Sequence, residues 1–307
     1  MSLIFSGDVN AIDLDAARIN GLDFNNDGSL LAVAFSSASK QPGVLVYQTT
    51  NHEIVGQFCE LGAALDVMYL SDRNELWYLT RAQDGSIELR IANLGGIQEI
   101  SLATYGSGEA IHALRRSRDN RNIAVLGNAV EVWDTARREV IRFKEADNPL
   151  AYIQASFNFD GSHLFIYGMR PSQVYCFDLL NDKFREEYPA PTPYGQQVVI
   201  SPFDEYLVLV GQGETGVYIY DLEKQTRLFA DEYNENSFTQ PFLFSMDGSI
   251  MITLERNLIG QPLPGGDLIY GPKLITGMPS AVASANDNPM LAYGIKNTLF
   301  WISLIQG

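Results

Sequence analysis

The sequence has few of the side chains that build metal sites, disulfide frameworks and nucleophilic active sites. It contains two cysteines and three histidines in 307 residues. Two cysteines, Cys59 and Cys176, are too few for a disulfide framework or a cysteine-based metal cluster. The histidines lie in separate stretches, whereas zinc and di-metal sites need clustered ligands. The sequence therefore predicts no cofactor and no metal site.

Basic residues are also scarce relative to acidic ones. There are 21 Lys and Arg against 37 Asp and Glu, which gives a formal net charge of −16 and a pI of about 4.5. An acidic surface repels a phosphate backbone, so general nucleic-acid binding is not expected. The charge favours basic or neutral partners, or it serves only to keep a large domain dispersed in water.

No stretch reaches the ~20 consecutive apolar residues that a membrane-spanning helix needs. The start of the chain lacks both a basic segment and a long apolar segment, and therefore does not resemble a secretory signal. From these two absences we expect a cytoplasmic protein without a membrane span.

A short unit of alternating apolar and polar residues, ending in an aromatic residue and Asp, recurs along the chain. It is found at Trp133-Asp134, Phe177-Asp178 and Tyr220-Asp221, at steps of 44 and 43 residues. Alternation with period two, followed by a polar turn, is typical of an antiparallel strand that enters a hairpin. A repeat of about 40 to 45 residues with this dipeptide indicates propeller blades.

A second series of landmarks consists of turns between a first and a second strand. The sequences Phe24–Ser29, Phe157–Ser162 and Phe244–Ser249 are close copies, in which Asp-Gly supplies the tight turn. Acidic residues mark seven such turns, at 27, 72, 119, 160, 204, 247 and 287. Their spacing predicts seven blades in a single domain that spans residues 1–307, although six or eight blades stay open.

Each turn is followed by an apolar run that fits a buried second strand, such as 30–35, 122–127 and 206–211. A third strand then carries the aromatic residue, and the residues assigned to it are Tyr47, Trp133, Phe177, Tyr220, Tyr270 and Trp301, with Ile91 in the second repeat. The segment 256–266 is assigned to a long loop. Charged fourth strands are expected at 53–58, 139–143 and 226–229, where charge protects an edge.

The two ends of the chain are expected to meet in one sheet. The last repeat ends at 301–304 without a fourth strand, and Leu3-Ile4-Phe5 has no partner of its own. We therefore predict that this N-terminal strand completes the seventh blade, and that deleting residues 1–8 lowers thermal stability sharply. Residues 13–18 are expected to form one helical turn.

Taken together, these repeats resemble those of the WD40 family of β-propellers over the whole chain. The resemblance implies an all-β, seven-bladed β-propeller with four antiparallel strands per blade. It departs from the family in lacking the Gly-His pair that precedes the first strand, and only one repeat keeps the literal Trp-Asp. Without the polar cluster that this His forms, we expect the blades to be held by aromatic packing alone.

The family resemblance implies a non-catalytic protein-interaction scaffold, a monomer within a larger complex. An alternative is a propeller enzyme, a hydrolase or lyase, with its site in the central channel. That alternative requires several His, Glu or Arg side chains to converge there. His112 opens a first strand and is expected to be a core or rim histidine, with a position facing the channel as the alternative. The Gly-rich segment 211–216 has no following helix, so it does not predict a phosphate-binding loop.

The loops that join successive blades are expected to lie on one face with the loops between second and third strands. Aromatic and acidic residues gather there: Tyr105, Glu109, Asp147, Tyr152, Tyr194, Asp231, Glu232, Tyr233, Glu235 and Phe238. This mixture suits a basic, extended peptide of a protein partner. Five of these residues, Tyr105, Tyr152, Tyr194, Tyr233 and Phe238, are the predicted partner-binding residues; the alternative is an ordinary solvated set of loops.

The third repeat also carries a local group of arginines on its opposite face. Arg115, Arg116, Arg118 and Arg121 surround one turn, and Arg137 and Arg138 lie in its other turn. Arg115, Arg116, Arg137 and Arg138 are predicted to bind an acidic protein or a phosphate group. The stretch 114–117 is similar to the Arg-Arg motif of phosphoinositide-binding propellers, but it lacks the final Gly. Ion pairs with Asp119 and Glu139 are the simpler use of these arginines.

Overall fold

The computed structural model describes most of the chain, and every regular element in the described part is a β-strand. The described residues are 3–4, 10–14, 17–37, 43–58, 63–96, 98–145, 152–168, 173–190, 195–211, 217–231, 242–244, 250–254, 257–263, 269–273, 281–285, 290–303 and 305–306. Within these ranges, no helix is long and apolar enough to cross a membrane.

The chain divides into two compact units. The first unit consists of Met1–Glu109, Leu254–Gly260 and Leu268–Gly307, and the second consists of Ala110–Thr253 and Gln261–Asp267. Each unit is built from antiparallel sheets whose strands follow one another along the chain.

The first unit contains three four-stranded sheets, ordered β3-β4-β5-β6, β10-β9-β8-β7 and β2-β29-β28-β27. The strands of the first two are β3 (Ala17–Phe24), β4 (Leu30–Ser37), β5 (Val44–Gln48), β6 (Ile54–Phe58), β7 (Ala63–Leu70), β8 (Glu75–Arg81), β9 (Ile87–Asn93) and β10 (Glu99–Tyr105). Those of the third are β2 (Asn10–Asp13), β27 (Ala281–Ser284), β28 (Met290–Ile295) and β29 (Thr298–Ser303). A separate pair joins β1 (Leu3–Ile4) to β30 (Ile305–Gln306).

The second unit contains the sheets β11-β12-β13-β14, β15-β16-β17-β18 and β19-β20-β21-β22. Their strands are β11 (Ala113–Arg116), β12 (Asn122–Leu126), β13 (Ala129–Asp134), β14 (Glu139–Glu145), β15 (Tyr152–Phe157), β16 (His163–Gly168), β17 (Gln173–Asp178), β18 (Lys183–Pro189), β19 (Gly195–Ile200), β20 (Tyr206–Gly211), β21 (Val217–Asp221) and β22 (Thr226–Asp231). A seventh sheet is ordered β23-β24-β25-β26. Its strands are β23 (Phe242–Phe244), β24 (Ile250–Leu254), β25 (Asn257–Pro262) and β26 (Ile269–Lys273).

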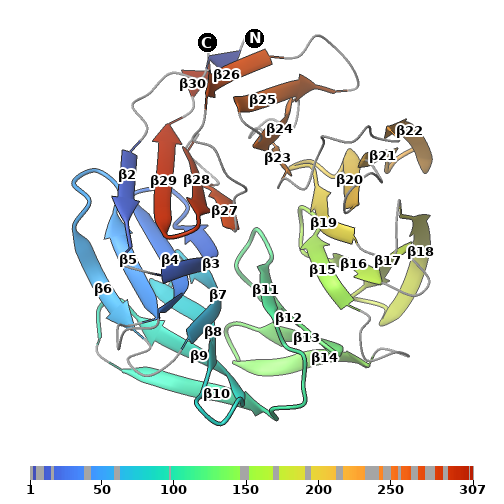
Figure 1. Cartoon of the computed structure of the whole chain (residues 1–307). Helices are drawn as coiled ribbons and strands as arrows, with labels where there is room; N and C mark the ends of the chain where they lie inside the picture. Colours follow the sequence, from blue (N-terminus) through green and yellow to red (C-terminus); the bar gives the residue numbers. More distant parts are fainter. Residues whose placement is uncertain are drawn as a thin grey trace. The chain divides into compact units, whose positions relative to one another are not determined.

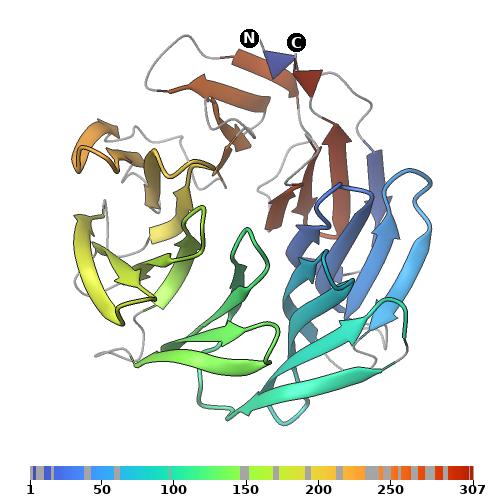
Figure 2. The same cartoon turned by 180° about the vertical axis from the view of Figure 1, so that it is seen from behind.

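Six of the seven four-stranded antiparallel sheets in the described part of the chain consist of consecutive strands, and the N-terminal strand β2 completes the seventh. This arrangement is a seven-bladed β-propeller. Figures 1 and 2 show the strands of β7 to β10 side by side from both directions. The class of fold, the four strands per blade and the role of the N-terminal segment are as the sequence predicted.

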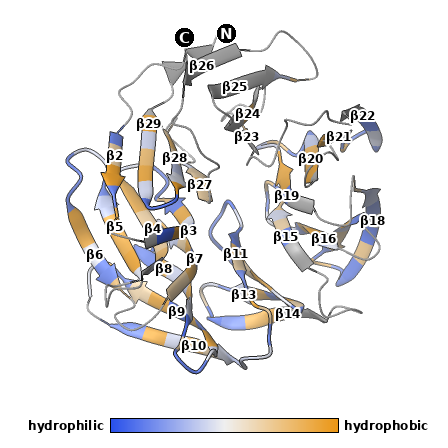
Figure 3. Cartoon of the chain, viewed as in Figure 1, coloured by the Kyte–Doolittle hydropathy of each residue, from blue (hydrophilic) through white to orange (hydrophobic). Residues whose placement is uncertain are grey.

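Apolar side chains pack between the faces of consecutive sheets within each unit. In the first unit, Val44 and Val46 pack with Val67 and Tyr78 of the next sheet. In the second unit, one cluster joins the sheets that begin with β11 and β15, and another joins those that begin with β15 and β19. Second strands are buried along most of their length: all residues of β28 are buried, and so are all but the first residue of β12 and of β16. Figure 3 shows apolar colour on the strands.

The residues of the closing strand differ from the prediction. The strand that pairs with β29 is β2, where Asn10 lies opposite Trp301, while Leu3 and Ile4 of β1 pair with β30. Asn10–Asp13 alternates between half-buried and exposed residues, as a fourth strand at a sheet edge does. Because this segment has no strong apolar run, the sequence pattern favours the more hydrophobic Leu3–Phe5 as the closing strand.

Two further predictions are wrong. Residues 13–18 do not form a helical turn, since Asp13 ends β2 and β3 already begins at Ala17. In the sixth repeat, the predicted loop 256–266 contains the third strand, β25, and Tyr270 belongs to the fourth strand, β26. Asn257–Pro262 contains Gly, Pro and polar residues, which are poor strand formers, so its pattern favoured a loop.

The expectation that packing alone holds the blades together is wrong. The buried carboxylate of Asp23 on β3 accepts the backbone N–H of Tyr69 on β7, at 2.7 Å. The Asn20 amide donates to the Ala64 carbonyl oxygen, at 2.7 Å. Hydrogen bonds therefore link consecutive sheets in addition to their apolar contacts.

Candidate partner-binding surface

The first-to-second turn and the third-to-fourth turn of a sheet lie at the same end and are bonded to each other. Counted in chain order, β3-β4-β5-β6 is the first sheet and β11-β12-β13-β14 is the third. In this third sheet the N–H of Thr135 donates to the carbonyl oxygen of Arg121, at 2.9 Å. The same bond joins Leu179 to Ser162, at 2.9 Å, and Leu222 to Glu205, at 3.0 Å. We call these six turns of the second unit, residues 117–121, 134–138, 158–162, 178–182, 201–205 and 221–225, the turn surface.

Each of the five first-to-second turns that the structure describes places one residue in the left-handed backbone region. These residues are Gly28, Asn74, Asn120, Gly161 and Asp204, with φ between 54° and 73°. Glycine, Asn and Asp tolerate this region better than other residues. At Gly161 an added Cβ would also lie 3.2 Å from the Cβ of Ser117 in the preceding sheet, so this turn approaches its neighbour closely.

The third-to-fourth turns explain why an aromatic residue is followed by Asp. The Asp134 carboxylate accepts the N–H groups of Ala136 and Arg137, both at 2.8 Å. Asp178 accepts those of Leu180 and Asn181, at 3.0 and 2.9 Å. The Asn181 side-chain amide and, to a smaller extent, the Arg185 guanidinium lower the pKa of Asp178 to about 2. These carboxylates serve the fold.

Turns of neighbouring sheets are also bonded to each other. The N–H of Phe159 donates to the Asp204 carboxylate at 2.6 Å, and the Asn158 amide reaches the same carboxylate at 3.3 Å. Partial burial raises the pKa of Asp204. The Arg118 guanidinium donates to the Pro202 carbonyl oxygen at 3.2 Å and lies 4.7 Å above the Phe159 ring. Arg118 thus connects the turns of three successive sheets.

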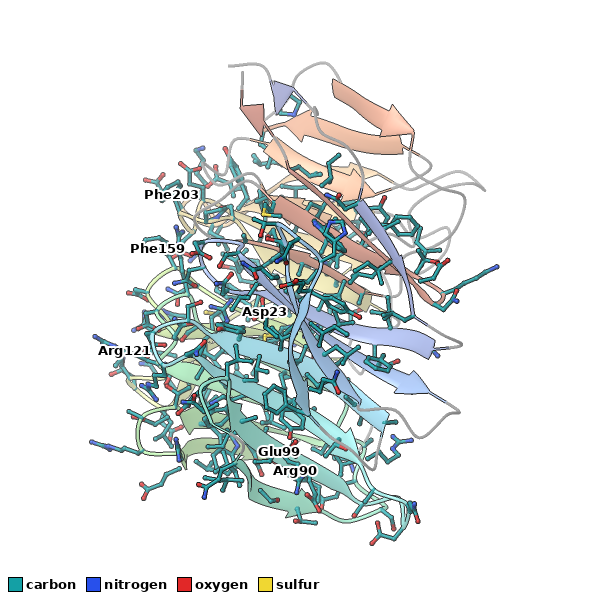
Figure 4. All side chains as sticks on the ribbon, turned by 90° about the vertical axis from the view of Figure 1, so that its left-hand side faces the viewer. Asp23, Arg90, Glu99, Arg121, Phe159 and Phe203 are labelled. Atoms are coloured by element: carbon teal, nitrogen blue, oxygen red, sulfur yellow. The ribbon has the colours of Figure 1, made fainter. Side chains whose placement is uncertain are left out.

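Phenylalanine is exposed at the tips of two of these turns. Phe159 is 43% exposed and Phe203 is 53% exposed. Their rings stack with centroids 5.9 Å apart and planes inclined by 29°. Figure 4 shows Phe203, Phe159 and Arg121 along the same side of the ribbon.

The equivalent turns show that this geometry does not require phenylalanine. The residue at the position of Phe159 is Asn26, Asp72 or Arg118 in the first three sheets, as the left-handed residue two places later establishes. At the position of Phe203 the others carry Asp27, Arg73, Asp119 and Asp160. Phe203 therefore stands where the other described turns carry charged residues, and Phe159 stands where three turns carry polar residues and the turn 201–205 carries Pro202. Burial in the fold does not account for the two phenylalanines.

Phe159 and Phe203 are not among the binding residues predicted from the sequence. The spacing of acidic residues aligns Asp204 with Asp160, whereas the structure aligns Asp204 with Gly161 and Phe203 with Asp160. In the sequence, Phe159 is one residue of a repeated turn. The signal that could have found both residues is the contrast between their side chains and the polar ones of the other repeats.

The arginines of the third sheet divide into two groups. Arg137 and Arg138 are exposed, and so are Arg118 and Arg121, the last pairing with Asp119 at 3.4 Å as the sequence suggested. Arg115 and Arg116 are half-buried. Arg115 donates to Gln154 of the next sheet, and Arg116 to Asn120 at 2.7 Å. The structure thus places Arg137 and Arg138, but not Arg115 and Arg116, at the surface.

The predicted loop face is described only in part. Tyr105 is 5% exposed, so its ring offers little surface to a partner. Glu109 is exposed and accepts the N–H of Gly106 at 3.1 Å. The backbones of Tyr152 and Asp231 lie in β15 and β22, but their side chains are outside the described residues. Also outside them are Asp147, Tyr194, Glu232, Tyr233, Glu235 and Phe238.

The histidines of the chain have local roles. The His52 ring meets Trp301 edge-on at 4.8 Å, and a His112 ring nitrogen lies 2.9 Å from the Ala110 carbonyl oxygen. His163 contacts Ser162 at 2.7 Å and Asp178 at 4.0 Å. In the part of the chain that the structure describes, no group of three or more His, Cys, Asp or Glu residues could hold a metal ion.

Comparisons with known proteins identify the fold alone. No protein-family model matches the sequence, and no curated protein matches it significantly. The structure is similar to a chain from the crystal structure of a mitotic checkpoint complex, with a TM-score of 0.76 and 14% sequence identity, over 98% of this chain and 93% of that one. This likeness extends over the whole propeller.

Proposed function

We propose that this protein is a non-catalytic scaffold that binds a partner protein and works as one component of a larger complex. It would be a degenerate relative of the WD40 propellers, acting in the cytoplasm without a cofactor. The chain similar in structure comes from a mitotic checkpoint complex, which is an assembly of this kind. At 14% identity, that likeness supports the architecture and not a particular partner.

The observation that carries the proposal is the exposure of Phe159 and Phe203 on turns that are held rigidly. Monomeric proteins rarely keep clustered large apolar side chains in water unless another molecule covers them. Phe159 is fixed through its N–H bond to Asp204, and Phe203 belongs to the same turn as that carboxylate. Side chains that are already ordered lose less entropy on binding, which favours their use as contact residues.

Leu180 extends the apolar character of this surface. It is 78% exposed and follows Leu179, whose N–H is bonded to Ser162 in the turn that carries Phe159. Three exposed apolar side chains thus come from two neighbouring sheets and from turns that are bonded together. Interfaces are built around such central apolar residues with polar residues at their rim.

Affinity purification of the tagged protein from the cells that express it tests this function. We expect one or more partners to be retained reproducibly above a tag-only control. Hydrogen–deuterium exchange of the complex should show slower exchange in the turns at 158–162 and 201–205. The outer strands β14 and β22, which also carry exposed apolar residues, serve as the internal control. If the wild-type protein retains no partner above background, the proposal is wrong.

A further inference from the structure

We propose that the turn surface binds an acidic linear peptide of a partner protein, with a large apolar side chain of the peptide placed against Phe159 and Phe203. This inference rests on the scaffold function proposed above and adds the chemical class of the partner. It also places the acidic part of the peptide on one side of the aromatic pair, because the charges on the two sides of the pair differ.

The aromatic pair provides the apolar part of the site. The two rings come from turns of neighbouring sheets, stack at 5.9 Å and remain 43% and 53% exposed. The Arg118 guanidinium lies against the Phe159 ring, so an incoming side chain would meet a surface that is apolar beside a fixed cation. A leucine or an aromatic side chain matches this surface, since both gain by covering apolar area.

The arginines provide the charge preference. Arg121 is 82% exposed at its side chain, and Arg137 and Arg138 are exposed on the turn bonded to it. Carboxylates lie among them, since Asp119 pairs with Arg121 at 3.4 Å, Asp134 accepts two backbone N–H groups and Glu139 is exposed. With Arg118, the four exposed arginines outnumber these three carboxylates. In a chain with a net charge of −16, such a cationic group is a local exception. Complementarity therefore selects an acidic partner here.

The opposite side of the aromatic pair carries negative charge. Glu205 is exposed next to Asp204, in the turn of Phe203. An acidic peptide would be repelled there and attracted toward Arg121 and Arg137. We therefore expect its acidic residues to lie on the side of the third sheet, with its apolar residue over the phenylalanines.

Three synthetic peptides test the inference by fluorescence anisotropy with the full-length protein. The first contains a block of glutamates followed by one tryptophan, the second has serine in place of the tryptophan, and the third has lysines in place of the glutamates. We expect the first peptide to bind at least about tenfold more tightly than either of the others. Raising the salt concentration should weaken its binding, because exposed charges are screened.

Variants then place the binding on the turn surface. The double variant Phe159→Ser with Phe203→Ser should bind the first peptide at least about tenfold more weakly. Val140→Ser with Leu228→Ser is the matched control, since these side chains are 41% and 42% exposed on β14 and β22. Circular dichroism and the melting temperature check folding. If the first double variant does not fold, Phe203→Ser alone should still weaken binding.

The charge preference has its own pair of variants. Arg121→Glu with Arg137→Glu should abolish the preference for the glutamate peptide over the lysine peptide. Arg18→Glu, at an exposed arginine of β3 in the first unit, is the control and should leave it unchanged.

Several results would overturn the inference while leaving the scaffold function standing. One is equal binding of the tryptophan and serine peptides, or complete competition by inorganic phosphate, because the surface would then recognise charge alone. Another is undiminished binding by the phenylalanine variant. A third is a dimer in solution that this variant disrupts, because a second copy of the chain would then cover the pair.

Discussion

The buried carboxylate of Asp23 shows how a single residue can connect two sheets of this fold. It is 7% exposed and accepts the N–H of Tyr69. A buried N–H that loses its acceptor costs about 1–3 kcal/mol. We therefore expect Asp23→Ala to lower the free energy of unfolding by about this amount, measured by urea denaturation.

Asp72 supplies the matched control for that substitution. It lies in the turn that follows β7, where its 47% exposed side chain pairs with Arg73 at 3.4 Å. Exposed pairs contribute little, so Asp72→Ala should change the free energy of unfolding by less than about 1 kcal/mol. Equal effects of the two substitutions would contradict the role assigned to Asp23.

Asp178 predicts a pH dependence of stability. Its pKa is lowered from 3.8 to about 2 in the folded protein, chiefly by the Asn181 amide. A lowered pKa means that the folded state favours the charged form, so the carboxylate stabilises the fold above pH 4. This contribution is lost as the pH falls from about 4 to about 2.

The measurement is thermal unfolding of the wild type and Asp178→Asn between neutral pH and pH 2. We expect the wild type to melt higher at neutral pH and the difference to shrink within that acidic window. Asn181→Ala removes the main cause of the lowered pKa, so the stability that this variant loses on acidification should be smaller than in the wild type, and the loss should end at a higher pH. A difference between the wild type and Asp178→Asn that stays constant with pH would contradict the assignment.

At this scale the sequence predicted residues that serve the fold better than residues that serve binding. The Asp that follows each aromatic residue was identified because it recurs with the repeat. Phe159 and Phe203 depart from the repeat, and recognising them required the structural alignment of the turns. Arg115 and Arg116 could not be separated from Arg137 and Arg138, because sequence alone does not show which guanidinium groups bond within the fold.

Among the elements, the bounds of the second strands were predicted closely, because these strands are strong apolar runs. Segment 206–211 coincides with β20, and 122–127 differs from β12 by one residue. The errors fall on β2 and β25, an edge strand and a strand rich in Gly, Pro and polar residues. Both are specified by pairing with a neighbouring strand, which a local pattern does not reveal.

The closing strand leads to a revised deletion experiment. Four residues of β2 pair with β29, whereas β1 forms a two-residue pair with β30. Removing residues 1–13 exposes the edge of β29 and uncovers Trp301, which is 1% exposed in the intact chain. We expect this deletion to lower the melting temperature sharply and to promote aggregation through the exposed edge.

Deletion of residues 1–8 is the control, because it removes β1 and keeps β2. It should lower the melting temperature much less than deletion of residues 1–13, in contrast to the expectation from sequence. Differential scanning calorimetry gives both values. Equal losses would show that residues 1–8, and not β2, provide the stabilisation.

For the whole molecule, the net charge of −16 predicts a response to salt opposite to that of the turn surface. Like charges repel one another in the compact state, and salt screens this repulsion, with a Debye length of about 30 Å at 0.01 M and about 8 Å at 0.15 M. The melting temperature at neutral pH should therefore rise between these ionic strengths, as followed by differential scanning calorimetry.

Binding of the acidic peptide should weaken over the same range of ionic strength, because the interaction that salt screens there is attractive. A melting temperature that falls with salt would mean that the ion pairs of the fold, such as Arg90 with Glu88 and Glu99, outweigh the overall repulsion (Figure 4).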